Sequence, residues 1–462
     1  MLTPILILIF YLCFSVFIWK DLLRGIYLIT LLLPTYLIRF EVFNIPLTLL
    51  EGMIWILFIF WLIKLYLDKE LNLTISAWLK SKFTKSETEQ GSIHNIVPHK
   101  LRWPVLAILA TATIALCWSP NLQAAAGIWK AFFIEPILFF MIMIYHVRKY
   151  NHIQKIINAL AILSIIIFVY TVIQKLTGWN ITNLDWYLPE TRRITTFFGY
   201  PNANGLFLAP LAALFFASLW FKEHFLFKIL KFIAFLGSVL TIIWAGNEGA
   251  LFALAAAVFI ILLLKKQTRI LAGAIMVLAI VIVMATPSIK TTLWQKITIN
   301  DFSGQIRQAQ WTETITMLSD QPIMGGGLAN YQRAIEPYHQ RGITINDQWQ
   351  PVEIFLYPHN LVLNFWTELG LLGLITIIWL FVIIGLLLYQ ISEINKKLPK
   401  YKQKFVGNLN LGILGFFSVI IIHGLVDVPY FKNDLSLVFW LIISLLVILY
   451  NHNLNKDIMS ED

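Results

Sequence analysis

The sequence predicts an all-α polytopic membrane protein, and three observations lead to that prediction. Hydrophobic residues make up 58% of the 462 residues and charged residues only 13%, roughly half the charged fraction of an ordinary soluble protein. The mean hydropathy is +0.74. Apolar runs of roughly 17 or more residues, enough to cross a hydrocarbon core, recur along the chain.

The apolar runs define about thirteen candidate spans. They lie at residues 2–19, 22–38, 45–67, 103–119, 124–146, 152–174, 203–221, 225–245, 249–264, 269–286, 361–389, 408–426 and 434–450. The second run is short, so we expect about 12 or 13 crossings. The first run precedes Lys20 instead of following a basic segment, so we expect it to be retained as a span and not cleaved as a signal peptide.

Lys and Arg cluster in every second connection, which assigns those connections to the cytoplasm. The connections near 39–44, 120–123, 175–202, 246–248, 287–360 and 427–433 then face outward. The net charge of +10 therefore reflects membrane topology, and we expect no nucleic acid partner. Cys13 and Cys117 lie in apolar runs, which supports neither a disulfide framework nor a thiol metal site.

This topology divides the chain into three regions. Residues 1–286 contain the first ten or so spans and a polar cytoplasmic loop at 68–102. Residues 287–360 form a large extracytoplasmic loop in which we expect short helices. Residues 361–462 contain the C-terminal spans.

Two arginines stand out in the outer connection at 174–202. Arg192 and Arg193 precede an aromatic segment and the next span. Basic residues on the outer face oppose the usual orientation signal, so the presence of these two calls for an explanation. They either bind an anionic substrate or contact the phosphate of a membrane lipid at the interface.

The large outer loop carries a helical pattern over residues 305–319. Trp311, Ile315 and Leu318 lie at i, i+4 and i+7, and Arg307 lies one turn earlier on the same stripe. We expect Arg307 either to snorkel toward the membrane interface or to bind an anion. The three glycines at 325–327 permit close backbone approach or a flexible turn, and no P-loop lysine follows them.

The loop ends at His359, directly before a long apolar helix. Asn360 is expected to cap that helix, and Asn364, Thr367 and Glu368 continue one polar face, which should face protein or a water-filled cavity. Asn360 and Glu368 are therefore candidate lining residues of a site. The positive end of the helix favours a neutral His359 ring, which suits it to accept a proton from an alcohol. The alternative is an ordinary hydrogen-bonding histidine.

Several charged residues lie within or at the ends of spans. Glu51, Lys130 and Glu135 are costly in lipid unless they are paired or hydrated. Lys130 and Glu135 share one candidate span, and we expect them to pair with neighbouring helices for structural reasons. Glu248 and Asp427 fall at outer helix ends, where they either line a site or are simply solvated.

Five segments together resemble the O-antigen ligase/polymerase family of bacterial membrane glycosyltransferases. They are Arg193 to Asn202, Asn247 to Leu251, Arg307 to Leu328, Pro358 to Gly370 and His423 to Asp427. Their order, spacing and outward placement carry the resemblance, which covers roughly residues 120 to 450.

The resemblance implies a GT-C-like helical fold and transfer of a glycan from an undecaprenyl-diphosphate-type carrier to an acceptor. The reaction would take place at the outer face of the bacterial cytoplasmic membrane. Arg193 and Arg307 match the diphosphate-holding arginines, and His359 matches the histidine that assists the acceptor hydroxyl. The family often has an arginine where this chain has Asn247-Glu248, and Arg192 is a candidate replacement.

The reaction implied by the resemblance needs no metal, because guanidinium groups can stabilise the departing diphosphate. The outer loops contain no Asp-x-Asp motif and no cluster with metal-ligand spacing, so neither a metal nor a cofactor is expected. The expected partners are a lipid-linked glycan donor and a glycan, lipid or protein acceptor. A protein O-oligosaccharyltransferase, a solute transporter and a flippase are the alternatives, although no internal repeat of the transporter type is evident.

Overall fold

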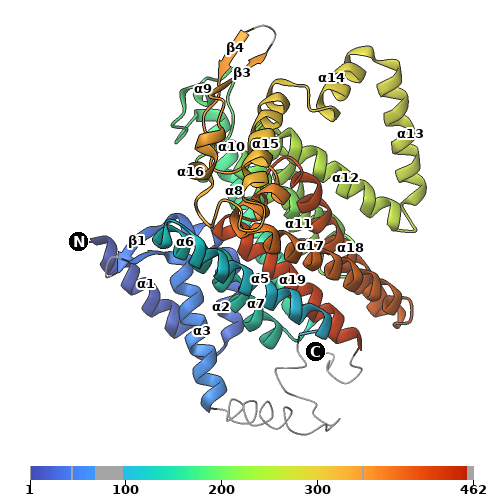
Figure 1. The fold of residues 1–462 in the computed structure, drawn as a ribbon. Coiled ribbons are helices and arrows are strands. Elements are labelled where there is room, and N and C mark those ends of the chain that lie inside the picture. The colour runs from blue at the N-terminus through green and yellow to red at the C-terminus, as the bar shows by residue number, and fades with distance from the viewer. Residues whose placement is uncertain (1, 43–44, 68–96, 346–347, 455–462) are drawn as a thin grey trace.

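Helices dominate the computed structural model, which describes residues 2–42, 45–67, 97–345 and 348–454 (Figure 1). Strand pairing in these ranges is limited to two short antiparallel hairpins, β1 (Arg39–Val42) with β2 (Ile45–Thr48), and β3 (Gly342–Ile345) with β4 (Gln348–Pro351). The predicted all-α polytopic membrane fold is confirmed.

The helices follow one another as α1 (Leu2–Trp19), α2 (Leu22–Leu31), η1 (Leu33–Leu37), α3 (Leu49–Leu67), α5 (His99–Trp118), α6 (Leu122–Trp129), the π-helical η3 (Lys130–Ile134), α7 (Glu135–His146), α8 (Tyr150–Thr177), α9 (Leu184–Tyr187), α10 (Pro201–Ser218), α11 (Phe225–Trp244), α12 (Glu248–Leu264), α13 (Arg269–Ala285), α14 (Pro287–Ile297), α15 (Phe302–Asp320), α16 (Tyr331–Ile335), η4 (Glu336–Tyr338), α17 (Leu361–Asn395), α18 (Lys400–His423) and α19 (Asn433–Leu454).

A helix lies at each predicted span, but fewer helices than predicted are by themselves long and apolar enough to cross a membrane. In the described ranges, eight helices are long and apolar enough to cross a membrane, and a bent pair that begins with α13 adds at most a ninth. The apolar helices within α1, α2 and α12 are shorter. The second predicted span, 22–38, is not one helix: α2 ends at Leu31, and a 3₁₀ turn with Pro34 in its first positions follows.

The predicted cytoplasmic loop at 68–102 falls largely on residues 68–96, which lie outside the described residues. Its final residues are already helical, because α5 begins at His99.

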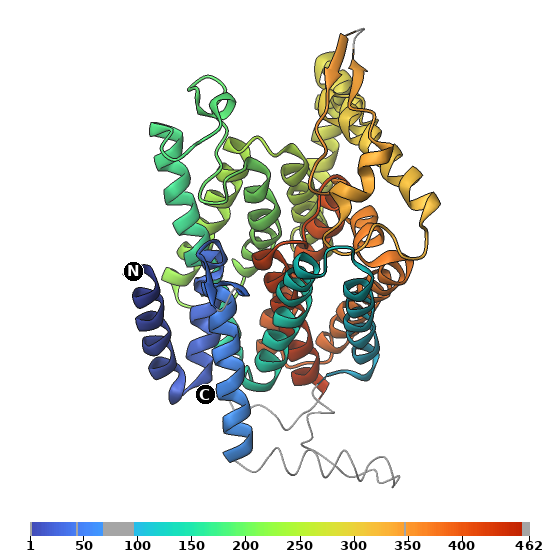
Figure 2. The same ribbon diagram turned by 60° about the vertical axis from the view of Figure 1, so that its left-hand side comes forward.

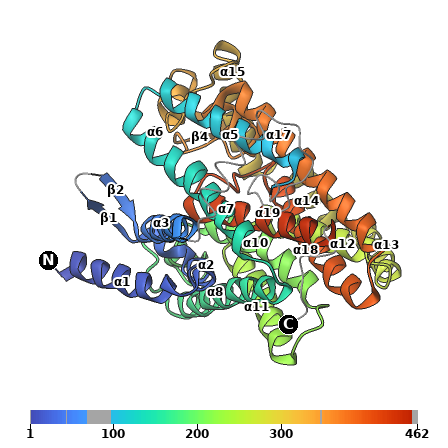
Figure 3. The same ribbon diagram turned by 90° about the horizontal axis from the view of Figure 1, so that it is seen from below.

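The interior of the bundle is built around α10, α18 and α19. α10 packs against α11, α12 and α18. In α19, 89% of an 18-residue apolar stretch is buried inside the protein. Figure 3 shows α10 and α19 near the centre, with α1 and α13 at opposite edges.

The long connections that the structure describes gather at one end of the bundle. Figure 2 shows the loop before α10, the helices α14 and α15 and the β3–β4 hairpin above the bundle, opposite the turns that precede α2 and α8. This arrangement agrees with the predicted alternation of connections.

α17 is interrupted after its first nine residues, from Leu361 to Leu369. Gly370 has φ 70° and ψ −174°, which no helix contains, and Leu371 N donates to Ile323 O at 3.0 Å. The glycine-rich segment packs into this break, where Gly326 N and Gly327 N both donate to Thr367 O. The three glycines therefore allow two backbones to approach closely, one of the two roles that the sequence suggested.

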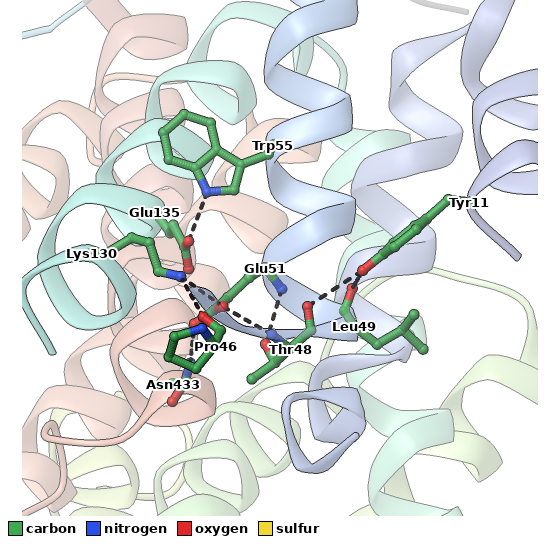
Figure 4. Close-up of polar contacts among 9 residues, drawn as sticks. All are labelled: Tyr11, Pro46, Thr48, Leu49, Glu51, Trp55, Lys130, Glu135 and Asn433. Atoms are coloured by element: carbon green, nitrogen blue, oxygen red, sulfur yellow. Dashed lines mark hydrogen bonds and ion pairs between the residues drawn. The ribbon is translucent and has the colours of Figure 1, made fainter. Parts of the chain in front are cut away.

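Buried charges connect α3, α7 and the start of α19, as Figure 4 shows. The Lys130 ammonium lies 3.0 Å from the Glu51 carboxylate, which also accepts from Asn433 Nδ2 at 3.3 Å. Trp55 Nε1 donates to Glu135 at 2.8 Å. Lys130 extends from the π-helical turn η3, so this irregular turn carries the only cation of the network drawn in the figure. The predicted pairing with neighbouring helices is confirmed.

We expect Lys130→Met to lower the free energy of unfolding by roughly 2–4 kcal/mol, because it leaves the Glu51 carboxylate buried without its cation. Thermal unfolding of the detergent-purified protein measures the effect. The matched control is Lys396→Met, since Lys396 forms an exposed ion pair with Glu393. This control should lower the free energy of unfolding by less than about 1 kcal/mol. Equal shifts for both variants would contradict the structural role of Lys130.

Gly370→Ala should destabilise the protein by more than about 2 kcal/mol, because the residue has positive φ and its Cβ would lie 2.2 Å from Ile323 O. Gly385, further along the same helix, has no atom within 4 Å of an added Cβ. Gly385→Ala should instead be neutral or stabilising by up to about 1 kcal/mol. Comparing the melting temperatures of the two variants tests whether the break in α17 requires glycine at position 370. A mild effect of Gly370→Ala would contradict that requirement.

Candidate functional site

The start of α17 and the segment after α18 are joined at the end of the bundle where the long connections gather. Leu361 N donates to Gly424 O at 2.7 Å, and Asn360 Nδ2 donates to Leu425 O at 3.0 Å. The Asn360 Oδ1 atom accepts from Leu363 N at 3.1 Å and caps α17 as predicted. These contacts bring His359 and Asp427 together.

His359 points its Nδ1 atom at Asp427 Oδ1, 3.4 Å away. Its backbone is left-handed, with φ 45°, which is uncommon for a residue other than glycine and often marks a functional position. The rings of Phe355 and Tyr357 meet the imidazole edge-on, at centroid distances of 5.2 and 4.8 Å. The imidazole is therefore confined on two sides and oriented by a carboxylate.

Asp427 is almost fully buried and also accepts from Val428 N at 2.8 Å. Burial raises the pKa of its carboxyl, but the hydrogen bond and charge of His359, with smaller contributions from His423 and Val428, outweigh burial and lower that pKa overall. The carboxylate is thus ionised at neutral pH and can only accept hydrogen bonds. This assigns the proton of a neutral His359 to Nδ1 and leaves Nε2 as an acceptor.

α15 holds the backbone that leads into His359. Trp311 Nε1 donates to Pro358 O at 2.8 Å, and Gln310 Nε2 donates to Tyr357 O at 2.7 Å. The predicted helix over 305–319 is therefore present, but its buried face differs from the expected stripe, because Ile315 is 54% exposed while Gln310 is buried. The polar Gln310 is buried because its amide binds a loop carbonyl.

Arg307 lies one turn before Trp311 on this helix. It is partly buried, and within the described ranges its guanidinium makes no hydrogen bond or ion pair. It is close enough to His423 for its charge to act on that ring. Arg307 is thus a free cation beside the segment that contains Asp427.

A buried amide network positions Arg193. Gln174 Oε1 accepts from the backbone of Thr195 and Thr196 at 3.1 and 2.8 Å, and Asn204 Nδ2 donates to Ile194 O at 3.0 Å. These bonds fix the extended segment that begins at Arg193 between α8 and α10. The guanidinium is consequently aimed at the turn between α11 and α12.

At that turn, Arg193 Nε donates to Ala245 O at 3.0 Å, and Nη2 donates to Gly246 O at 3.3 Å. Gly246 has φ 63°, and a Cβ there would lie 3.1 Å from Arg193 Nε, so glycine leaves room for the guanidinium. Burial lowers the pKa of Arg193, and the nearby Glu248 carboxylate opposes that shift. Arginine nevertheless stays protonated in proteins.

Glu248 and Gly249, at the start of α12, link Arg193 to the His359–Asp427 pair. Glu248 forms an ion pair with Lys296 of α14. A Cβ at Gly249 would lie 3.0 Å from Val426 and 3.4 Å from the His423 ring. The start of α12 therefore lies against the segment that ends in Asp427.

Two predicted site residues lie elsewhere. The Arg192 guanidinium donates to the carbonyls of Lys175 and Tyr187, at 2.8 and 3.0 Å, and so fastens its own loop to the end of α8. The Glu368 carboxylate accepts from Ala329 N at 2.7 Å and holds the glycine-rich segment at the break in α17. Both residues have structural partners, and the structure brings neither of them to the His359–Asp427 pair.

Three residues of this region were not singled out from the sequence. His423 is buried, and its Nδ1 atom has no hydrogen-bond partner in the described part of the chain. Tyr357 and Tyr200 share a hydrogen bond, and burial raises the pKa of both hydroxyls. The spacing of His423 and Asp427, one helical turn apart, was the available signal for His423.

The arrangement combines an oriented imidazole, a buried carboxylate and two arginines at one end of a membrane bundle. Such a set can accept a proton from a hydroxyl group and stabilise an anionic leaving group. In the ranges that the structure covers, no three His, Cys, Asp or Glu side chains come together as a metal site would require.

Comparison with known protein families gives a match over part of the chain. Residues 232–378 match the family model described as O-Antigen ligase, a range that includes Glu248, Arg307 and His359 but neither Arg193 nor Asp427. No curated protein matches the chain. The match confirms the predicted resemblance to the O-antigen ligase/polymerase family and supports a glycosyltransferase of the O-antigen ligase type.

Proposed function

We propose that this multi-pass membrane protein with an O-antigen ligase domain moves a glycan from a polyprenyl-diphosphate carrier to an acceptor hydroxyl. The reaction takes place at the outer face of the bacterial cytoplasmic membrane. The observation that carries the proposal is the orientation of His359 by the buried Asp427, at the bundle end where Arg307 lies free.

His359 acts as the general base in this proposal. Its Nε2 atom takes the proton of the acceptor hydroxyl as that oxygen bonds to the anomeric carbon of the glycan. The bond between the anomeric carbon and the phosphate oxygen breaks, and the diphosphate leaves on its lipid carrier. Asp427 stabilises the imidazolium that forms, and the 3.4 Å distance allows the contact to tighten when substrate binds.

Arg307 and Arg193 bind the diphosphate. A guanidinium group donates two parallel hydrogen bonds to phosphate oxygens and stabilises the negative charge that grows on the leaving group. Arg307 has its whole guanidinium available, whereas Arg193 keeps two donors on backbone carbonyls and offers the remaining ones. Because these cations stabilise the leaving group, we propose that transfer is independent of a metal ion.

The outer loop excludes water from the reaction in this proposal. His339, after η4, lies 3.2 Å from Glu313 of α15 and contacts Val352 O at 2.9 Å with its other ring nitrogen. Gln340 N also donates to Glu313 at 2.9 Å. These bonds fasten the segments on either side of the β3–β4 hairpin to each other and to α15, which gives the outer loop a fixed shape. In this proposal the loop as a whole keeps water from the reaction and reduces competing hydrolysis.

His359→Ala should lower the rate of glycan transfer by roughly 10²–10⁴-fold, because the acceptor loses its base. The assay follows release of carrier diphosphate from purified lipid-linked glycan in the presence of EDTA, with either a glycan or a peptide acceptor. The matched control is His224→Ala, since His224 caps α11 at the opposite end of the bundle. Unchanged transfer by His359→Ala would contradict the assignment of His359 as the general base. Preference for the glycan or the peptide acceptor distinguishes a glycan-transferring ligase or polymerase from a protein O-oligosaccharyltransferase.

Arg307→Lys should slow transfer by roughly tenfold or more, because an ammonium group cannot donate the paired hydrogen bonds of a guanidinium. The control is Arg333→Lys, which changes an exposed arginine of α16 in the same outer loop. Added inorganic diphosphate should compete with the donor and inhibit transfer less strongly in Arg307→Lys than in the unchanged protein. In Arg333→Lys its inhibition should be unchanged. Equal rates and equal competition in both variants would remove Arg307 from the diphosphate site.

A further inference from the structure

A groove of about 360 Å³ opens on the outside of the bundle between α1, α2, α8 and α11. It lies far from His359, near the end of the bundle opposite the one that carries the His359–Asp427 pair. Its walls are largely apolar, and Phe17, Leu28, Ile162 and Phe227 contribute to them. The volume is within the range of ligand-binding clefts, roughly 300–1,000 Å³.

Polarity changes along the groove in the same direction on two helices. α2 contributes Arg24 near its start and Leu28 one turn deeper, and α8 contributes Lys155 near its start and Ile162 two turns deeper. Basic side chains therefore mark the end of the groove at the membrane interface, and apolar side chains line the part that enters the hydrocarbon region.

Among the residues that the structure describes, the two cations have no acidic partner. Arg24 lies over the Phe17 ring at 5.6 Å, and Lys155 lies over the Tyr27 ring at 6.0 Å, and neither forms an ion pair with a described residue. None of the residues that line the groove is acidic. The nearby Asp21 carboxylate accepts from Leu23 N at 2.9 Å and so caps α2.

Two polar groups of the groove also lack partners among the described residues. The Tyr27 hydroxyl and the Asn158 Oδ1 atom are buried and have no hydrogen bond in the described part of the chain. The hydroxyl group is a donor and the amide oxygen an acceptor. Both side chains line the groove, so rotation of either would offer its polar group to a ligand with phosphate oxygens and a hydroxyl group.

We propose that this groove is a binding site for one anionic phospholipid with a hydroxyl-bearing headgroup, of the phosphatidylglycerol type. Arg24 and Lys155 bind the phosphate, and an acyl chain lies along Leu28 and Ile162. The basic connections assign this end of the helices to the cytoplasmic leaflet, where anionic lipids attract basic side chains. The site is independent of the glycan-transfer proposal.

Native mass spectrometry of the full chain, purified in detergent with equal amounts of phosphatidylglycerol and phosphatidylcholine, tests the site. We expect one phosphatidylglycerol to be retained preferentially. Arg24→Gln with Lys155→Gln should lower the ratio of retained phosphatidylglycerol to phosphatidylcholine by roughly tenfold or more. The control pair Lys266→Gln with Lys400→Gln removes the same charge from exposed positions outside the groove and should leave the ratio unchanged.

A second variant tests whether the groove itself is needed, without changing its charge. Ala159 lines the groove, so Ala159→Trp should fill it and reduce retention of the lipid while Arg24 and Lys155 remain. Thermal unfolding of each variant verifies that the protein is folded. Equal retention of the two lipids by the unchanged protein, or equal loss in both charge-removing pairs, overturns the proposal in favour of non-specific lipid contact.

Discussion

Pairing of buried charges across helices is the constraint on which the structure depends. A carboxylate or an ammonium group in an apolar bundle is costly without a partner, so each pair fixes how two distant helices sit together. Lys130 and Glu51 join η3 to α3 in this way. Lys231 of α11 pairs more locally, with Glu223 in the turn that precedes the helix. The His359–Asp427 contact follows the same rule but leaves one ring nitrogen free for chemistry.

The sequence predicts what depends on local pattern and composition. The positions of the helices, the Asn360 cap and the pairing of Lys130 and Glu135 with a neighbouring helix all follow from apolar periodicity or from the cost of charge in lipid. The break at Gly370 does not, because a single glycine in an apolar run is compatible with an unbroken helix. Only the partner backbone at Ile323 explains its positive φ.

The candidate site was predictable in its location but not in its partners. Arg192 and Arg193 are neighbours in the sequence, yet successive side chains of an extended segment point to opposite sides, and only Arg193 faces the turn before α12. Likewise, nothing in the chain order indicates that Glu248 pairs with Lys296. Such contacts depend on tertiary packing between segments that are distant in sequence.

The two hydrogen bonds that join Leu361 to Gly424 and Asn360 to Leu425 have a consequence for the response to bilayer thickness. They fix the axial register of α17 and α18 at the end that carries His359. A thinner or thicker bilayer is then accommodated by tilting both helices together or by adjustment at their far ends. The relative position of the His359 imidazole and the Asp427 carboxylate is thereby kept when the bilayer thickness changes.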